Sequence, residues 1–291
     1  MLGGHPEIGW LGEFEYALDL HPEEGGLLPA PLYRAWLPED RRFRAQGFRI
    51  DPRLDTADLI RSFLAQARER SGKAQIGATF HRCFERIPRL WRNPRIIHLV
   101  RDGRDVALSR IGMGWAGNPW KACGRWREVE EVWDRFAEVL PAGSSYEVRY
   151  EDLVAQPQQT LEGLCAFLGV PYEPRMLSYP AWSRYGPPDP TMGAKWLRRY
   201  TPHQLAQVEA EIGEMLSQRG YPLSGVAPRR PTRIAKLGLD IQNWAYRVRY
   251  RVRHYGVALV GAEFLARRLG LRSLRSRMQH RLDEVIEREL L

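Results

Sequence analysis

The segment RIIHLVRDGRDVALSR, from Arg95 to Arg110, joins a short apolar run to a helical pattern through an arginine-containing turn. A strand that ends at Arg101, followed by a helix that begins near Asp105, would place a guanidinium beside the unpaired N–H groups of a helix start. Ser109, about one helical turn further on, can point at the same place. These groups favour a bound anion such as a phosphate. The alternative is a solvated turn in which Asp105 caps the helix and Ser109 bonds back to its own helix.

The elements that must position these residues alternate between helix and strand patterns. The expected elements are a helix from Asp55 or Thr56 to Gly72, a strand over 74–79, a strand over 146–150, and a helix through Leu168 that Gly169 ends. This alternation is typical of an α/β protein with a parallel sheet flanked by helices.

The pattern R-D-x-R-D-V-x-x-S resembles the segment with which sulfotransferases hold the 3′-phosphate of 3′-phosphoadenosine 5′-phosphosulfate, and the resemblance places Arg101 and Ser109 on that phosphate. The chain is most similar to bacterial sulfotransferases related to the tyrosylprotein and heparan type, rather than to the cytosolic phenol type. Five flanking segments resemble the family in the family's own order: 5–13, 77–102, 148–174, 193–209 and 219–225.

The resemblance implies a sulfotransferase of the P-loop nucleotide-hydrolase-like α/β fold. Such an enzyme would take 3′-phosphoadenosine 5′-phosphosulfate (PAPS) as co-substrate and transfer its sulfuryl group to a hydroxyl or amine, without a metal. Specificity for the acceptor depends on loops, so these motifs do not identify the acceptor.

One family segment has no counterpart in this sequence. Sulfotransferases open with a strand and a Gly-x-Pro-Arg-Ser-Gly-Thr-Thr-like loop whose backbone N–H groups hold the 5′-phosphosulfate. Met1 stands where the family finishes the helix after that loop, so we interpret it as an internal methionine of a longer product or as the start of a truncated homologue. The G-x-G-x-x-G spacing that begins at Gly112 follows a helix start rather than a strand, so we expect a loop there.

Sulfuryl transfer needs a base for the acceptor proton, and the sequence offers His81 and Glu13. His81 follows the expected strand over 74–79 and resembles in place the catalytic histidine of the cytosolic family, although packing or capping would also explain it. Glu13 resembles the acidic base of the tyrosylprotein and heparan enzymes. Because Phe14 stands where that base is expected, Glu13, Glu15 or neither could inherit the role, and we favour Glu13 slightly over His81.

Three further residues are candidates for nucleotide binding by resemblance. Tyr150 would lie near the adenine or 3′-phosphate, and Lys195 and Arg198 would form a late basic element that closes over the nucleotide. Tyr150 could instead cover the core, and the two basic residues could be ordinary surface charges. Arg104 and Arg110 are expected to be solvated.

Composition limits the remaining possibilities. The chain has 291 residues, of which 44% are hydrophobic, so it can bury a substantial core. Its 3 cysteines form no C-x-x-C pair, which argues against a disulfide framework or a zinc site. No apolar run is long enough to span a bilayer, and no signal peptide is recognisable. We therefore expect a cytoplasmic protein that could lie on a membrane surface.

The basic charge is concentrated at the C-terminal end. Residues 227–291 contain 15 Lys and Arg against 6 Asp and Glu, whereas the rest of the chain contains 29 of each. The Pro-rich and Arg-rich run from Val226 to Pro231 predicts a linker between a catalytic domain, 1–225, and a basic tail, 226–291. Residues 241–259 fit a helix better than a strand because no turn signal flanks them. Arginines around apolar positions favour binding of this helix to an anionic membrane surface. Packing of the helix on the catalytic domain would explain the pattern equally well. Binding to nucleic acid is a weaker alternative.

Two other functions compete with sulfuryl transfer. The first is a non-catalytic nucleotide-binding or membrane-surface adaptor, in which the basic tail supplies the function. The second is a phosphotransferase similar to nucleotide kinases, which requires a Gly-x-x-x-x-Gly-Lys loop that this sequence does not contain.

Overall fold

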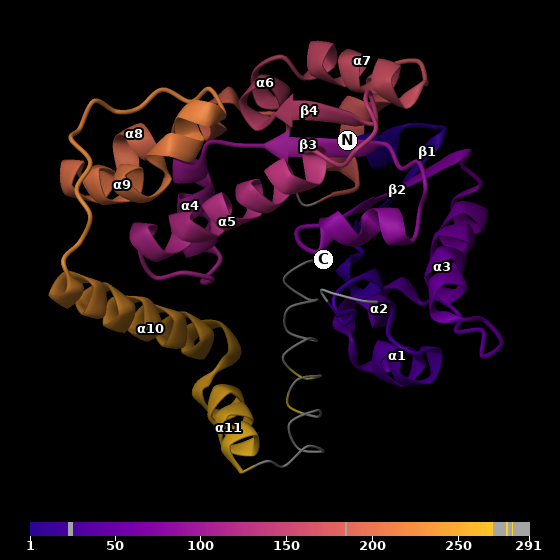
Figure 1. Cartoon of the computed structure of the whole chain (residues 1–291), viewed down its shortest axis with the longest axis horizontal. Coiled ribbons are helices and arrows are strands. Elements are labelled where there is room, and N and C mark those ends of the chain that lie inside the picture. Colours follow the sequence, from indigo (N-terminus) through magenta and orange to yellow (C-terminus); the bar gives the residue numbers. More distant parts are fainter. Residues whose placement is uncertain (23–25, 184, 270–277, 279–280, 282–291) are drawn as a thin grey trace.

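Two pairs of parallel strands form the centre of the protein. The computed structural model describes the chain except residues 23–25, 184, 270–277, 279–280 and 282–291. Strand β1 (Ile8–Glu13) pairs with β2 (Gln75–Thr79), and β3 (Ile96–Val100) pairs with β4 (Ser145–Arg149). Among the described strands, the two pairs do not hydrogen-bond to each other. Figure 1 shows the N-terminus close to the junction between them.

Helices surround these strands, which confirms the expected α/β class (Figure 1). They are α1 (Ala30–Trp36), α2 (Arg41–Gln46), α3 (Thr56–Ser71), α4 (Gly103–Gly112), α5 (Pro119–Ala137), α6 (Tyr150–Ala155), α7 (Pro157–Leu168), α8 (Trp196–Arg199), α9 (Pro202–Gln218), α10 (Arg233–Tyr255) and α11 (Val257–Arg268). Short 3₁₀ helices span Leu2–Gly4, Glu15–Ala17, Leu37–Glu39, Phe84–Arg89, Pro174–Ala181 and Pro190–Met192.

Helix α3 shows why the local predictions succeed. The Asp55 carboxylate accepts the backbone N–H of Asp58 over 2.8 Å, which caps the helix start. Gly72 ends the helix at φ +62°, a conformation that glycine adopts without strain. Leu59, Ile60 and Phe63 are fully buried in the core that α3 shares with the chain after β1. Strands β2 and β4 and the end of α7 at Gly169 also lie where the sequence predicts them.

The start of α4 differs from the sequence prediction. Its N-cap is Asp102, whose carboxylate accepts the N–H of Arg104 over 2.8 Å, so the helix begins at Gly103. Asp105 instead accepts the backbone N–H groups of Trp196 at 2.9 Å and Lys195 at 3.3 Å. The carboxylate predicted to be a cap therefore fixes the beginning of α8 against α4.

Arg104 is buried, contrary to the expectation of a solvated side chain. Its guanidinium bonds Asp102 and Glu209, each at 2.7 Å, and lies 3.6 Å from the ring centroid of Trp196. Two carboxylates and an aromatic face compensate the loss of hydration. Arg104 therefore joins α4, α8 and α9.

Candidate active site

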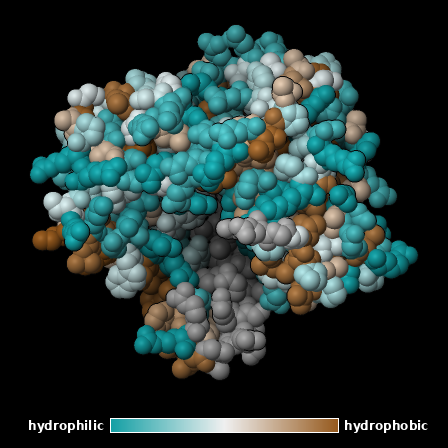
Figure 2. All heavy atoms as spheres, viewed as in Figure 1, coloured by the Kyte–Doolittle hydropathy of each residue, from teal (hydrophilic) through white to brown (hydrophobic). Residues whose placement is uncertain are grey.

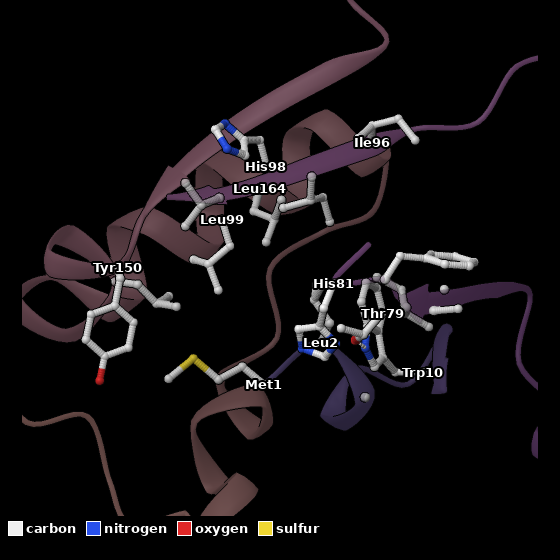
Figure 3. A pocket seen from close by; sticks show the side chains of 18 of the residues that line it. Met1, Leu2, Trp10, Thr79, His81, Ile96, His98, Leu99, Tyr150 and Leu164 are labelled. Carbon is white, nitrogen blue, oxygen red and sulfur yellow. Dashed lines mark hydrogen bonds between the residues drawn. The ribbon is translucent and has the colours of Figure 1, made fainter. Parts of the chain in front are cut away.

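A large cleft separates the two strand pairs. It has a volume of about 2180 Å³ and is lined by all of β2, by residues 96–99 of β3, by Trp10 of β1 and by Leu164 of α7. Figure 3 shows Leu99 and Leu164 on one side, with Met1, Leu2 and His81 across from them. Most small-molecule sites are smaller, about 300–1,000 Å³, so this cleft can hold more than one ligand group.

The cleft exposes strand edges that a continuous sheet would cover. Among the described strands, β2 pairs only with β1 and β3 only with β4, so the edges of β2 and β3 toward the cleft are unpaired. Leu99 is 56% exposed although it lies within a parallel strand. Strands of parallel sheets are normally covered on both faces. The cleft therefore lies between two strand edges that are unpaired among the described strands.

Three polar side chains line the cleft where strands end. His81 follows β2, Arg101 follows β3 directly, and Tyr150 follows β4 directly; all three line the cleft. Figure 3 shows Tyr150 and His81 at the cleft. Ligands of parallel α/β sheets bind beyond the carboxyl ends of the strands, so this end of the cleft is the candidate active site.

His81 forms a close pair with a buried carboxylate. Its Nδ1 lies 2.6 Å from Glu15 Oε1, which also accepts the backbone N–H of His81 over 3.0 Å. Arg42 Nη1 lies 3.3 Å from the other oxygen of Glu15. Glu15 is buried, whereas the side chain of His81 is 65% exposed. If Nδ1 carries the proton shared with Glu15, Nε2 is the nitrogen that can accept a proton at the cleft.

The pair shifts the pKa of both groups. The hydrogen bond that the His81 ring donates to Glu15 raises the pKa of His81, because the carboxylate stabilises the imidazolium. Burial by itself would raise the pKa of Glu15, but the hydrogen bonds from His81 and from the backbone outweigh burial and lower it. The resulting group is a histidine held in place by an ionised carboxylate.

Glu13 lies apart from this pair. Its carboxylate is 46% exposed and forms an ion pair with Arg41 at 3.0 Å, and Glu13 does not line the cleft. The fully buried Phe14 follows it, and the 3₁₀ helix Glu15–Ala17 turns the next carboxylate inward. Of the two glutamates left open by the sequence, Glu15 is the one that contacts His81. The sequence does not predict the contact of Arg42 with Glu15, because Arg42 lies on a separate helix, α2.

Within the described part of the chain, Arg101 has an unpaired donor beside the cleft. Its guanidinium lies 4.2 Å from the ring centroid of Tyr150, and its Nη2 donates to the carbonyl of Met192 over 2.7 Å. Its Nε is buried and has no hydrogen-bond partner among the described residues. A buried donor without an acceptor fits a site where a ligand oxygen completes the hydrogen bonding. The helix start beside it contributes less than the sequence suggests, because Asp102 already caps α4.

The remaining predicted nucleotide-binding residues lie outside the cleft lining. Ser109 is half-buried on α4, Lys195 is half-buried before α8, and Arg198 is exposed on α8. Arg110 does line the cleft, and its buried Nε also lacks a partner among the described residues. Burial and the nearby charges of Arg125 and Arg247 lower the pKa of Arg110. The sequence marks Arg110 only as a neighbour of the phosphate motif.

No group of three or more His, Cys, Asp or Glu side chains in the described part of the chain could hold a metal ion. Nor is any helix among these residues long and apolar enough to cross a membrane.

The fold is that of an α/β protein, a class in which ligands bind at the carboxyl ends of parallel strands, where the candidate site lies. Residues 1–174 match the model of the Sulfotransferase family. Because this match covers more than half of the 291 residues, the protein belongs to the sulfotransferase family.

Two solved structures have a similar fold. The sulfotransferase domain from the curacin biosynthetic pathway is 21% identical with a TM-score of 0.54, and the alignment covers 76% of this chain and 92% of that one. The sulfotransferase domain from the Synechococcus PCC 7002 olefin synthase is 22% identical with a TM-score of 0.56, covering 76% of this chain and 88% of that one. No curated protein matches this chain.

Proposed function

We propose that this protein transfers a sulfuryl group from PAPS to a hydroxyl or amine of an acceptor. The observation that carries this proposal is the position of His81 and Arg101, a proton acceptor and an anion-binding group, at the ends of β2 and β3 on one cleft. Membership of the sulfotransferase family supports the class of reaction.

His81 acts as the general base. The acceptor oxygen or nitrogen forms a bond to sulfur while the bond from sulfur to the phosphate oxygen breaks, and 3′,5′-adenosine bisphosphate leaves. The proton of the acceptor passes to His81 Nε2, and the Glu15 carboxylate stabilises the imidazolium that results. Glu15 is a positioning residue, because it acts on the acceptor only through His81.

Arg101 and Tyr150 hold the 3′-phosphate end of the nucleotide. The guanidinium supplies the charge and the unpaired Nε–H, and the Tyr150 ring fixes its plane. We keep the proposed nucleotide-binding role of Ser109, Lys195 and Arg198. None of these side chains lines the cleft, so each would have to move toward it to contact the nucleotide.

The open edges of β2 and β3 support the expectation that a strand and a glycine-rich turn hold the 5′-phosphosulfate. Such a turn supplies backbone N–H donors to the oxygens on which charge develops. Loss of even one donor of this kind typically slows an enzyme by ~10²–10³-fold. We therefore expect slow transfer by residues 1–291 alone.

The test is transfer of ³⁵S-labelled sulfuryl from PAPS to a panel of phenols, alcohols and amines. Residues 1–291 are compared with the product of the reading frame that includes any codons before Met1. His81→Ala should abolish transfer by the more active form, while Glu13→Gln should change it little. Rapid turnover by residues 1–291 would contradict the role given to the strand edges. Absence of transfer by both forms would favour the adaptor function.

A further inference from the structure

Helix α10 is held against the protein by one polar face. Tyr246 Oη donates to the carbonyl of Ile111 over 3.0 Å, and Asn118 Nδ2 donates to the carbonyl of Leu239 over 2.7 Å. The backbone N–H of Gly117 donates to Asn243 Oδ1 over 2.8 Å. These contacts all reach the end of α4 or the loop between α4 and α5, so this region fixes the rotation of α10 about its own axis.

Glycines in that loop allow the close approach. A Cβ atom at Gly117 would lie 2.7 Å from Asn243 Cα, a distance that real Cβ atoms do not show. Gly114 has φ +71°, and a Cβ there would lie 2.2 Å from the ring of Tyr250. Contact with α10 thus explains Gly114 and Gly117, which lie in a loop as expected, whereas Gly112 ends α4 and has nothing within 4 Å of the position that its Cβ would take.

The opposite face of α10 is apolar and open. Its side chains are separated by three, four, three and four residues, which places them on one helical stripe. Their exposed fractions range from 38% to 85%. We call these residues the α10 stripe: Ile234, Leu237, Ile241, Trp244 and Val248. In Figure 2, hydrophobic residues (brown) lie among hydrophilic ones (teal) at the lower left, where α10 lies in Figure 1.

Arginines border the stripe. Helix α10 contains five arginines and one lysine but only one acidic residue, Asp240, which pairs with Lys121 at 2.5 Å. Arg251 pairs with Glu263 at 3.2 Å. Arg247 and Arg249 lie on the two sides of the stripe and have no ion-pair partner among the described residues, so their charges are available to an anionic surface.

We propose that the α10 stripe lies on an anionic lipid surface, with the flanking arginines at the level of the headgroups. An interfacial helix has this combination of an apolar face, basic flanks and low overall hydrophobicity. The polar face of α10 already contacts the α4–α5 loop, so the stripe on the opposite face points away from that loop. Charge complementarity selects anionic rather than neutral lipid.

The test is co-sedimentation of the whole chain with vesicles of phosphatidylcholine alone or mixed 3:1 with phosphatidylglycerol. We expect binding to the mixed vesicles to be at least tenfold tighter and to weaken as salt rises. Ile241→Glu/Trp244→Glu should reduce binding at least tenfold, while Val139→Glu/Leu197→Glu, which alters exposed apolar residues elsewhere, should not. Circular dichroism checks that both variants remain folded.

A second pair of variants tests the charges. Arg247→Glu/Arg249→Glu should lower binding to the mixed vesicles, whereas Arg68→Glu/Arg135→Glu, at sites on α3 and α5, should lower it much less. Equal binding by the stripe variant and its control would overturn the proposal, as would equal binding to both vesicle types. Light scattering that shows a dimer lost in the stripe variant, without lipid binding, would assign the stripe to a second copy of the chain instead.

Discussion

Glu15 Oε1 lies 2.6 Å from His81 Nδ1, although the two residues are 66 positions apart in the sequence. The contact joins the 3₁₀ helix after β1 to the segment after β2, and it exists because β1 and β2 run side by side in parallel. A buried carboxylate beside an exposed imidazole gives the histidine a defined proton-bearing nitrogen, which a base at this position requires.

The pKa of His81 should therefore respond to Glu15. In the folded protein it should lie above 6.5, and Glu15→Gln should lower it because the imidazolium loses its partner. Glu13→Gln should lower it less, since the charge of Glu13 raises this pKa by a smaller amount. NMR titration of the His81 ring measures all three values. Equal shifts in the two variants would contradict the pairing.

The same shift predicts a pH dependence of stability. Because folding raises the pKa of His81, this residue stabilises the folded state. Its contribution to the free energy of unfolding is fully present below the pKa of the unfolded chain, about 6.5, and is lost as pH rises through the pKa of the folded protein. Folding lowers the pKa of Glu15, so its contribution to stability is present above the pKa of the unfolded chain. That contribution is lost as pH falls through the pKa of the folded protein. Urea unfolding across pH should therefore show a smaller dependence for Glu15→Gln than for the natural chain at both ends of the range.

Arg104 should be important for folding. Arg104→Met leaves Asp102 and Glu209 buried without their common partner, and breaking such a pair typically costs about 3–5 kcal/mol. Arg199→Met, at an exposed site, should change the free energy of unfolding by no more than ~0.5 kcal/mol. Urea denaturation compares them, and similar values for the two variants would show that the buried network contributes little.

Gly117 should be required for the docking of α10. Gly117→Ala forces a Cβ against the backbone of Asn243, and overpacking of this kind typically costs about 1–3 kcal/mol. Gly112→Ala is the matched control, because nothing lies within 4 Å of the position that its Cβ would take. Hydrogen exchange in α10 should become faster in the first variant only; unchanged exchange in both would mean that the loop does not hold the helix.

Local signals in the sequence predict much of the fold. The cap at Asp55, the ending at Gly72 and the alternation of β4 depend on neighbouring residues, and the structure has these elements where they are expected. The cap of α4 is missed because Asp102 and Asp105 are equally good caps in isolation, and only the packing of α8 assigns Asp105 to another partner.

The candidate site is less predictable for the same reason. Arg101, Tyr150 and His81 could be placed at strand ends from the sequence, but their meeting at one cleft depends on the arrangement of the strands. The choice between Glu13 and Glu15 depends on which carboxylate the 3₁₀ helix turns inward, and no periodicity encodes it. The exposure of Arg110 to the cleft likewise follows from the position of α4 after β3.

Calorimetric titration with 3′,5′-adenosine bisphosphate and with AMP tests the central claim most directly, because the two ligands differ in the 3′-phosphate assigned to Arg101. We predict that the bisphosphate binds more tightly and that Arg101→Ala removes the difference, at a cost of ~1.5–3 kcal/mol for a charged hydrogen bond. Arg199→Ala, at an exposed position outside the cleft lining, should have a smaller effect. Equal affinities for the two nucleotides, or an unchanged Arg101→Ala protein, would contradict the assignment of this cleft to the sulfuryl donor.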